Sequence, residues 1–481
     1  MLTMSTGIHR ANMRQIGLFA LNDTAVNLYF LMMGYMSYYL AGVLGLAVAL
    51  VSFLLAALNI FDGITDPIIG YIIDKTSGRF GKFRPFMVSG NVILALNLGF
   101  LYCIRHAPSA LILPLLIVCL IIYDIGFTLQ ANVTRSAQAV LTNDPKQRPL
   151  FAAFSTVFSV LLYVGVAVMV SEFLIPRHGD FSAEMFGDFF ILVAFASAVC
   201  TILAVIGIRA KDRPAYYGAP PEAAQKVKLR DCIGILKHNR NVRMLIISAS
   251  TDRLFSHIAM NAVVLVMIFG IIGGNYELYG RMSMLVFAPS MLVALSVIWY
   301  ARRHGQRAAL LLSTKGAMLA NTLIFLAFVF GDPTTLSFSA WSSFTILFFV
   351  GLAFRGGFMT IGGRIIIPMI ADCSDDEVFR SGKYVPGMIS GLFTFADKIF
   401  GSLNMLMVGA LVILAGYGDM FPSVTTAYSS PIFIIAMICY CGLPMLGWII
   451  NLIALRYYDL TPARIEQVRK TAAERKKTTE A

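Results

Sequence analysis

Two aspartates lie four residues apart within an apolar stretch of the chain. The stretch from Asn59 to Gly70 is apolar enough to enter a bilayer, yet it carries Asp62 and Asp66. A charged side chain near the bilayer centre costs roughly 2.5–3.5 kcal/mol on insertion scales, so two carboxylates need a compensating role. Residues i and i+4 share a helix face, with Thr65 beside them. These oxygens form a ligand set for Na⁺ or H⁺; the alternative is a pair of acids neutralised by a structural Lys or Arg.

The composition predicts a membrane protein. Of the 481 residues, 58% are hydrophobic and 13% are charged, whereas soluble domains are about one-quarter charged. Apolar runs long enough to span about 30 Å of hydrocarbon recur along the whole chain. They lack the alternation of a β-barrel, so the fold class is an all-α membrane protein. We count twelve transmembrane helices.

The charge distribution sets the expected topology. The net charge of +12 lies mostly in alternate loops, as the positive-inside rule requires, and does not indicate nucleic-acid binding. We therefore expect both termini to be cytoplasmic in a multi-pass protein. The seven cysteines form no CxxC or Cys/His cluster, which argues against a disulfide framework or a zinc site. The expected parts are a six-helix half, a cytoplasmic linker, a second six-helix half and a cytoplasmic tail: 1–208, 209–242, 243–457 and 458–481.

Two basic turns suggest an internal repeat. The turn Arg79–Arg84 follows the second span, and the turn Arg302–Arg307 follows the eighth. Corresponding turns in two halves indicate a parallel duplication. The pattern Gly70-x-x-x-Asp74-Lys75, followed by this first turn, resembles the cytoplasmic loop motif of the major facilitator superfamily. The resemblance implies the major facilitator fold, with two six-helix halves.

A narrower resemblance rests on two motifs. They are Asp62-Gly-Ile-Thr65-Asp66-Pro67-Ile-Ile-Gly70 and Gly81-Lys82-Phe-Arg84-Pro85-Phe. The chain resembles the glycoside-pentoside-hexuronide:cation symporters, the family that includes the melibiose permease. The similarity is strongest at 17–90 and returns at 142–150 and 371–398.

This resemblance implies a secondary active transporter in a bacterial-type inner (plasma) membrane. Such a protein moves a glycoside or sugar together with Na⁺ or H⁺ by alternating access. Its expected partners are the sugar, the coupling cation and membrane lipid, with no nucleic acid. We expect a monomer, no enzyme activity and no cofactor beyond the coupling ion.

The resemblance also assigns roles to individual residues. The cation site of the family matches Asp62, Thr65, Asp66 and Thr128, and the two acids would be metal ligands only if the ion is Na⁺. The coupling lysine matches Lys398, with Thr394 one turn before it. The sugar-binding acid of the first span matches Asp23, with Asn27 at i+4; the alternative is an Asp that braces a helix contact.

Elsewhere the sugar site departs from the melibiose pattern. The aromatic platform of the family falls on Arg135, and its fourth-span acid falls on Ala131 or, with a slip, on Asn132. Arg364 is a further deep cation, and Asn261 is a candidate for sugar hydroxyls. Arginine binds carboxylates through two hydrogen bonds, so these cations favour an anionic uronide. In the alternative, Arg135 and Arg364 pair internally with acidic side chains, which leaves the substrate site neutral. The candidate acids are Asp124, Asp252 or Asp397.

Two charged segments are candidates for a gate. The basic segment carries Asp74, Lys75, Arg79, Lys82 and Arg84, and the acidic segment 372–377 carries Asp375 and Asp376. Ion pairs between them across the inner mouth would break when the carrier reorients. The alternative is charge that only sets topology or lies in solvent.

Other protein classes fit the sequence less well. The chain offers no metal-ligand cluster, nucleophile–base signature or phosphate loop for an enzyme, and no repeated filter for a channel. Within carriers, the alternatives are an amphiphile such as a lysolipid or a non-sugar organic anion. A sensor without transport would not need the complete cation set.

Overall fold

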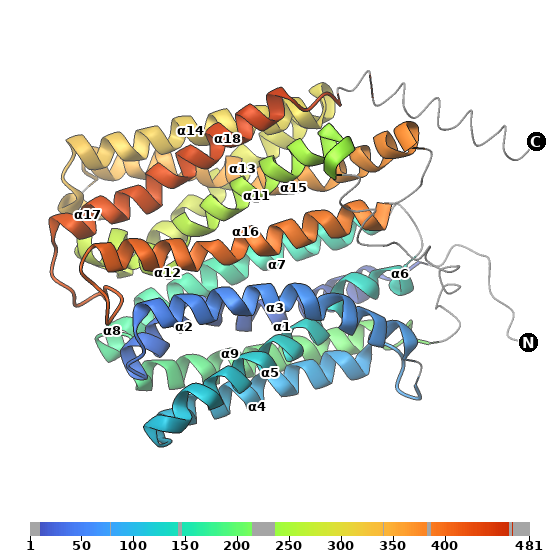
Figure 1. Cartoon of the computed structure of the whole chain (residues 1–481), viewed down its shortest axis with the longest axis horizontal. Coiled ribbons are helices and arrows are strands. Elements are labelled where there is room, and N and C mark those ends of the chain that lie inside the picture. Colours follow the sequence, from blue (N-terminus) through green and yellow to red (C-terminus); the bar gives the residue numbers. More distant parts are fainter. Residues whose placement is uncertain are drawn as a thin grey trace, which may run out of the picture. The chain divides into compact units, whose positions relative to one another are not determined.

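The computed structural model describes residues 10–76, 78–142, 147–213, 236–339, 341–381, 386–460 and 464. Over these ranges the regular structure is helical, with no strand (Figure 1). The chain divides into two compact units. Unit 1 comprises Met1–Ala223 and Gly416–Thr425, and unit 2 comprises Ala224–Ala415 and Thr426–Ala481.

Six long helices build unit 1, continued in places by short helical turns. The long helices are α1 (Met13–Met33), α3 (Val48–Lys75), α4 (Arg84–Cys103), α5 (Ser109–Ser136), α7 (Arg148–Val168) and α9 (Ala183–Ile208). The short ones are α2 (Met36–Tyr38), η1 (Tyr39–Val43), η2 (Ile104–His106), α6 (Gln138–Leu141), η3 (Met169–Leu174) and α8 (Ile175–His178).

Unit 2 repeats this plan. Its long helices are α11 (Arg240–Ala259), α13 (Glu277–His304), α14 (Gln306–Phe330), α15 (Ser343–Ser381), α16 (Pro386–Leu414) and α18 (Leu443–Arg456). Its short segments are α12 (Ala262–Leu265), η5 (Val266–Ile272), η6 (Pro333–Thr335), α17 (Ser430–Met437) and η7 (Ile438–Gly442).

The helices are long and apolar enough to cross a membrane. Among the described residues there are 11 such spans, and a twelfth if α11 and the segment Ala262–Ile272, which are bent by 46°, form one span. Large apolar side chains cover the outside of the helices, such as Leu96 at 70% and Phe195 at 71% exposure. Exposed apolar surface on this scale suits contact with lipid.

The helices of unit 1 pack through small and polar side chains. Gly90 of α4 faces Gly126 of α5 so closely that a Cβ on Gly90 would lie 2.9 Å from the Gly126 carbonyl oxygen. Asn22 of α1 donates to Thr134 Oγ1 (2.8 Å), and Gln130 donates to Thr201 Oγ1 (2.9 Å). Without a hydrophobic force between helices in lipid, close approach and interhelical hydrogen bonds hold a bundle together.

Backbone geometry supports the internal repeat. Residues with positive φ among the described residues are six glycines, and they form three pairs at corresponding places. Gly45 and Gly274 follow the π-helical end of the first span, and Gly81 and Gly305 lie in the turns after α3 and α13. Gly179 and Gly416 follow the fifth span of each unit, after α8 and α16. Because L-residues avoid positive φ, both halves turn by the same glycine-dependent device.

One segment lies outside the half to which the sequence assigned it. Residues 416–425 follow α16 in the chain, within the predicted half 243–457, but their contacts place them in unit 1. Val48 N–H donates to the Gly418 carbonyl (3.0 Å), and Tyr38 Oη donates to the Pro422 carbonyl (3.0 Å). The position of this segment in the chain does not predict these contacts, because their partners lie far away in sequence.

The α4–α5 contact gives a stability prediction. Gly90→Val places a branched side chain against the backbone of α5, and overpacking of this kind costs about 1–3 kcal/mol. We expect a lower midpoint of thermal unfolding for the detergent-solubilised protein. Gly187→Val is the control, because a Cβ there meets nothing within 4 Å. Equal midpoints for the two variants would contradict the packing described.

Candidate functional site

Helices α3 and α5 bring the expected cation residues together. Thr128 Oγ1 on α5 donates to Asp62 Oδ1 on α3 (3.2 Å). Thr65 Oγ1 on α3 donates in the other direction, to Asp124 Oδ2 on α5 (2.7 Å). Each helix therefore supplies one carboxylate and one hydroxyl to a pair of crossed hydrogen bonds. We call these four residues the Asp–Thr cluster.

The Asp–Thr cluster is half enclosed. Thr128 is 0% exposed, Asp124 2% and Thr65 7%, whereas Asp62 is partly exposed. Asp66 is also partly exposed, and its backbone carbonyl accepts a hydrogen bond from Asn132 Nδ2 (3.1 Å). The arrangement places carboxylate and hydroxyl oxygens within reach of an entering ion.

The donor chemistry of this cluster suits a small hard cation. Its oxygens are carboxylate and hydroxyl, without the nitrogen or sulfur ligands that transition metals favour. Among the described residues, no group of three or more His, Cys, Asp or Glu side chains could hold a metal ion.

Asp124 is the residue that the sequence analysis did not assign to this site. There it appeared only as a possible internal partner of an arginine. The signal that could have found it is its position four residues before Thr128, on the same face of α5. The sequence did not reveal that its partner would be Thr65.

The predicted sugar residues of α1 are in direct contact. Asn27 Nδ2 donates to the Asp23 carbonyl (2.7 Å) and to Asp23 Oδ1 (3.2 Å). Both side chains are partly exposed. The i,i+4 spacing thus produces the expected carboxylate–amide pair, whose sugar-binding role remains a prediction.

The coupling residues Thr394 and Lys398 lie on α16, in unit 2, one helical turn apart. On the same helix Asp397 forms an ion pair with Arg253 of α11 (3.1 Å). Asn261 accepts from Val263 N–H (3.0 Å) and so caps α12 at the bend of its span, while its Nδ2 lies 3.5 Å from Met405 Sδ. Capping is a local function that the sequence analysis did not foresee for Asn261.

Three acids are proposed as internal partners of Arg135 and Arg364, and the structure shows these partners for them among the described side chains. Asp252 accepts from Trp448 Nε1 (2.9 Å), and Asp397 accepts from Arg253. Asp124 accepts from Thr65. The side chains of four predicted residues lie outside the described ones: Asp74, Arg135, Arg364 and Asp375.

Arg355 of α15 is buried, at 4% exposure, and bonds to neutral groups. Its guanidinium donates to Asn321 Oδ1 (3.1 Å) and to the Tyr440 carbonyl (3.2 Å), and it lies 4.0 Å from the centre of the Tyr440 ring. Asn321 Nδ2 in turn donates to the Cys441 carbonyl (2.9 Å). Both carbonyls belong to η7, a π-helical turn. Here the side chains of Arg355 and Asn321 supply the hydrogen bonds that these carbonyls accept. The structure thus gives Arg355 a bracing role between α15 and η7.

The basic turn after α3 has a partner that the sequence analysis missed. Asp212, which is 1% exposed, accepts from the backbone N–H groups of Lys82 (2.9 Å), Phe83 (3.2 Å) and Arg84 (3.1 Å). It also forms an ion pair with Arg84 Nε (3.3 Å). A carboxylate at the N-terminus of α4 is favoured by the helix dipole. A Cβ on Gly81 would clash with this carboxylate.

Two further predicted gate residues, Asp376 and Lys75, contact residues of their own unit. Asp376 is fully buried and forms an ion pair with Arg380 (2.9 Å) and a hydrogen bond with Asn241 Nδ2 (3.0 Å). Lys75 lies over the Tyr71 ring, 4.6 Å from its centre, and Arg79 is exposed. Arg84 and Asp376 thus each have an oppositely charged partner within their own unit, and ion pairs between the two charged segments stay a prediction.

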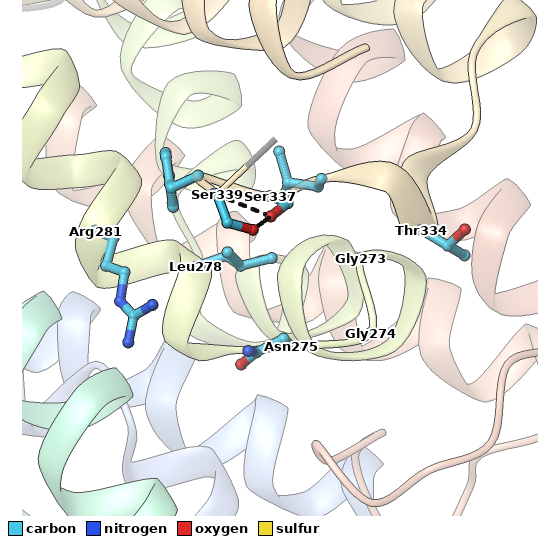
Figure 2. Close-up of a pocket in the computed structure, with 10 residues that line it drawn as sticks. Gly273, Gly274, Asn275, Leu278, Arg281, Thr334, Ser337 and Ser339 are labelled. Carbon is cyan, nitrogen blue, oxygen red and sulfur yellow. Dashed lines mark hydrogen bonds between the residues drawn. The ribbon is translucent and has the colours of Figure 1, made fainter. Parts of the chain in front are cut away.

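A cavity of about 400 Å³ opens in unit 2, apart from all predicted site residues. It lies between the end of η5, the start of α13 and the segment 334–339, and Arg281 contributes to its wall (Figure 2). Ser337 and Ser339 face each other there at 2.8 Å. Arg281 is already paired with Glu277 (3.1 Å), so this cavity offers no clear charge for an anion.

A family model described as "MFS/sugar transport protein" matches residues 18–462. The chain belongs to this family of major facilitator sugar transporters. The match confirms the major facilitator fold and the function as a cation-coupled sugar symporter that the sequence predicts.

Individual relatives are distant. The chain is 22% identical over 457 residues to the putative glycoside/cation symporter YagG of Escherichia coli, covering 94% of this chain and 92% of that protein. It is also 22% identical over 473 residues to the glucuronide carrier protein homolog of E. coli, covering 95% of each. Among solved structures, a mutant of the nucleoside transporter NupG aligns with a TM-score of 0.63 at 14% identity, over 92% of this chain and 100% of that one.

The Asp212 contacts give a second prediction. Asp212→Ala leaves three backbone donors of the turn unpaired, and each buried unpaired group costs about 1–3 kcal/mol. We expect a clear drop in the thermal unfolding midpoint in detergent. The control is Asp459→Ala, an exposed acid that follows α18 as Asp212 follows α9. An unchanged midpoint for Asp212→Ala would show that the carboxylate does not hold the turn.

Proposed function

We propose that this sugar symporter couples a cation bound at the Asp–Thr cluster and Asp66 to uptake of a glycoside. The observation that carries the proposal is the pairing of two carboxylates and two hydroxyls between α3 and α5. An entering cation offsets the negative charge of Asp62 and Asp66. Coupling requires that each ligand bind more tightly when the other is present.

Lys398 is the proposed coupling group. A lysine that interacts with the span-2 acids in the absence of the ion would compete with the entering cation, and its release would favour the loaded conformation. Thr394 would support it from the same face of α16. Asp23 and Asn27 would bind sugar hydroxyls, because a carboxylate accepts and an amide donates.

The proposal places the protein in a bacterial-type inner membrane with both termini in the cytoplasm. It rests on the excess of Lys and Arg in alternate loops. The protein would act as a carrier and not as an enzyme.

A uronide is the second candidate substrate. The specific support is the similarity to a protein named as a glucuronide carrier homolog and the presence of Arg135 and Arg364 in predicted spans. Among the described side chains, Asp124, Asp252 and Asp397 bond to Thr65, Trp448 and Arg253.

Uptake by proteoliposomes tests the substrate class. The purified chain is reconstituted, a Na⁺ or H⁺ gradient is imposed, and labelled glucuronide is compared with the matching neutral glycoside. Preferential uptake of the glucuronide supports the anionic site. Equal or better uptake of the neutral sugar contradicts it, and no gradient-driven uptake of any glycoside contradicts the symport proposal.

The two span-2 acids give the third prediction. Asp62→Asn and Asp66→Asn remove a cation ligand charge, so uptake should lose its cation stimulation while the protein still reaches the membrane. The control is Asp459→Asn. Full stimulation in both variants would remove the coupling assignment.

Asp23 gives the fourth prediction. Asp23→Ala deletes a charged hydrogen-bond acceptor, and such bonds contribute about 1.5–3 kcal/mol, so the sugar KM should rise roughly tenfold or more. The cation concentration for half-maximal stimulation should change much less. A larger change in the cation requirement than in the sugar KM would move Asp23 out of the sugar site.

A further inference from the structure

Asp124 is a buried carboxyl group that the cation set inferred from the sequence does not include. It is 2% exposed, and the described part of the chain provides it with no ion pair. Burying a carboxyl group is costly unless it is hydrogen-bonded and its charge is offset. As a simple helix contact, an uncharged partner for Thr65 would serve with less penalty. The position of Asp124 therefore calls for a functional explanation.

The partner of Asp124 indicates what it does. Thr65 Oγ1 has a single proton and three acceptors within reach: Asp124 Oδ2 at 2.7 Å, the Asp62 carbonyl at 3.2 Å and the Phe61 carbonyl at 3.4 Å. Threonine in a helix usually donates back to the preceding turn. Here the nearest acceptor lies on the neighbouring helix, so Asp124 draws the proton toward α5.

The direction of this proton decides how Thr65 can bind an ion. A hydroxyl has one donor and two lone pairs. When the Thr65 proton is directed to Asp124, the lone pairs of Thr65 Oγ1 can bind a cation. In the second crossed pair, Thr128, one turn along α5 from Asp124, donates in the opposite direction, to Asp62 on α3.

We propose that Asp124 is a positioning residue that orients the Thr65 hydroxyl so that its oxygen coordinates a metal cation, Na⁺ or Li⁺. This inference rests on the proposed function and sharpens it. A proton needs only a carboxylate, whereas a coordinated metal ion needs oriented neutral oxygens as well.

A double-mutant cycle tests this role in reconstituted protein. The variants are Asp124→Ala, Thr65→Ala and the double variant, and the readouts are sugar uptake against Na⁺ concentration and Na⁺ binding to the purified protein by calorimetry. Asp124→Ala should raise the Na⁺ concentration for half-maximal stimulation about tenfold, the typical effect of one lost hydrogen bond to a charged group. The sugar KM at saturating Na⁺ should stay nearly unchanged.

The combination of variants separates positioning from other roles. If Asp124 acts through Thr65, its removal from the Thr65→Ala protein should add little further loss. Asp124→Asn keeps an oxygen that can accept from Thr65 and should recover most of the Na⁺ affinity. The matched control is Ser197→Ala, which removes a buried hydroxyl that binds Asn91 and the Ala25 carbonyl. Should Asp124→Ala not fold, Asp124→Ser, whose shorter side chain cannot reach Thr65, replaces it.

Three results overturn the inference. They are additive losses in the double variant, an unchanged Na⁺ requirement in Asp124→Ala, and wild-type uptake driven by H⁺ with no response to Na⁺ or Li⁺. The first two leave cation coupling intact and remove only the role of Asp124. The third contradicts the metal cation while proton-coupled symport stands, whereas absence of any ion response would remove the proposed function as well.

Discussion

Negative charge inside an apolar bundle is the constraint on which this structure depends. Asp62, Asp66 and Asp124 lie on helices long and apolar enough to cross a bilayer, where a bare carboxylate is expensive. The two crossed hydrogen bonds between α3 and α5 reduce this cost without removing the charge. Threonine hydroxyls carry no positive charge, so these two hydrogen bonds do not themselves offset the charge of the carboxylates; in the proposed function a cation does so.

Other buried polar groups are satisfied by different means. Asp252 is bound by an indole N–H, and Arg355 lies against an aromatic ring and carbonyls of a π-helical turn. Asp376 combines an arginine with an amide. These groups bond to residues of unit 2 and brace it. The contrast with the Asp–Thr cluster separates structural charge from charge that is available for transport.

The two halves share their turning points but not their chemistry. Glycines with positive φ recur at corresponding places in both units, so the backbone plan is duplicated. The turn after α3 is held by Asp212, whereas the turn after α13 is held by Arg307, which donates to the Leu455 carbonyl (3.0 Å). In both cases the end of the sixth long helix fixes the turn between the second and third. The two units therefore share a backbone plan, while the side chains that hold corresponding turns differ.

The sequence by itself determined the fold class, the internal repeat and the helix face of Asp62, Thr65 and Asp66, because hydropathy and i,i+4 spacing are local properties. It also placed Asp23 beside Asn27 for the same reason. Only the tertiary structure paired Thr65 with Asp124 and Arg84 with Asp212, and joined residues 416–425 to unit 1. These partners lie on different helices or loops. The pair Asp376–Arg380, in contrast, has the i,i+4 spacing of a single helix, which the sequence already contains. Which of several acids meets a given hydroxyl or cation depends on how the helices pack, and spacing along one helix carries no information about that.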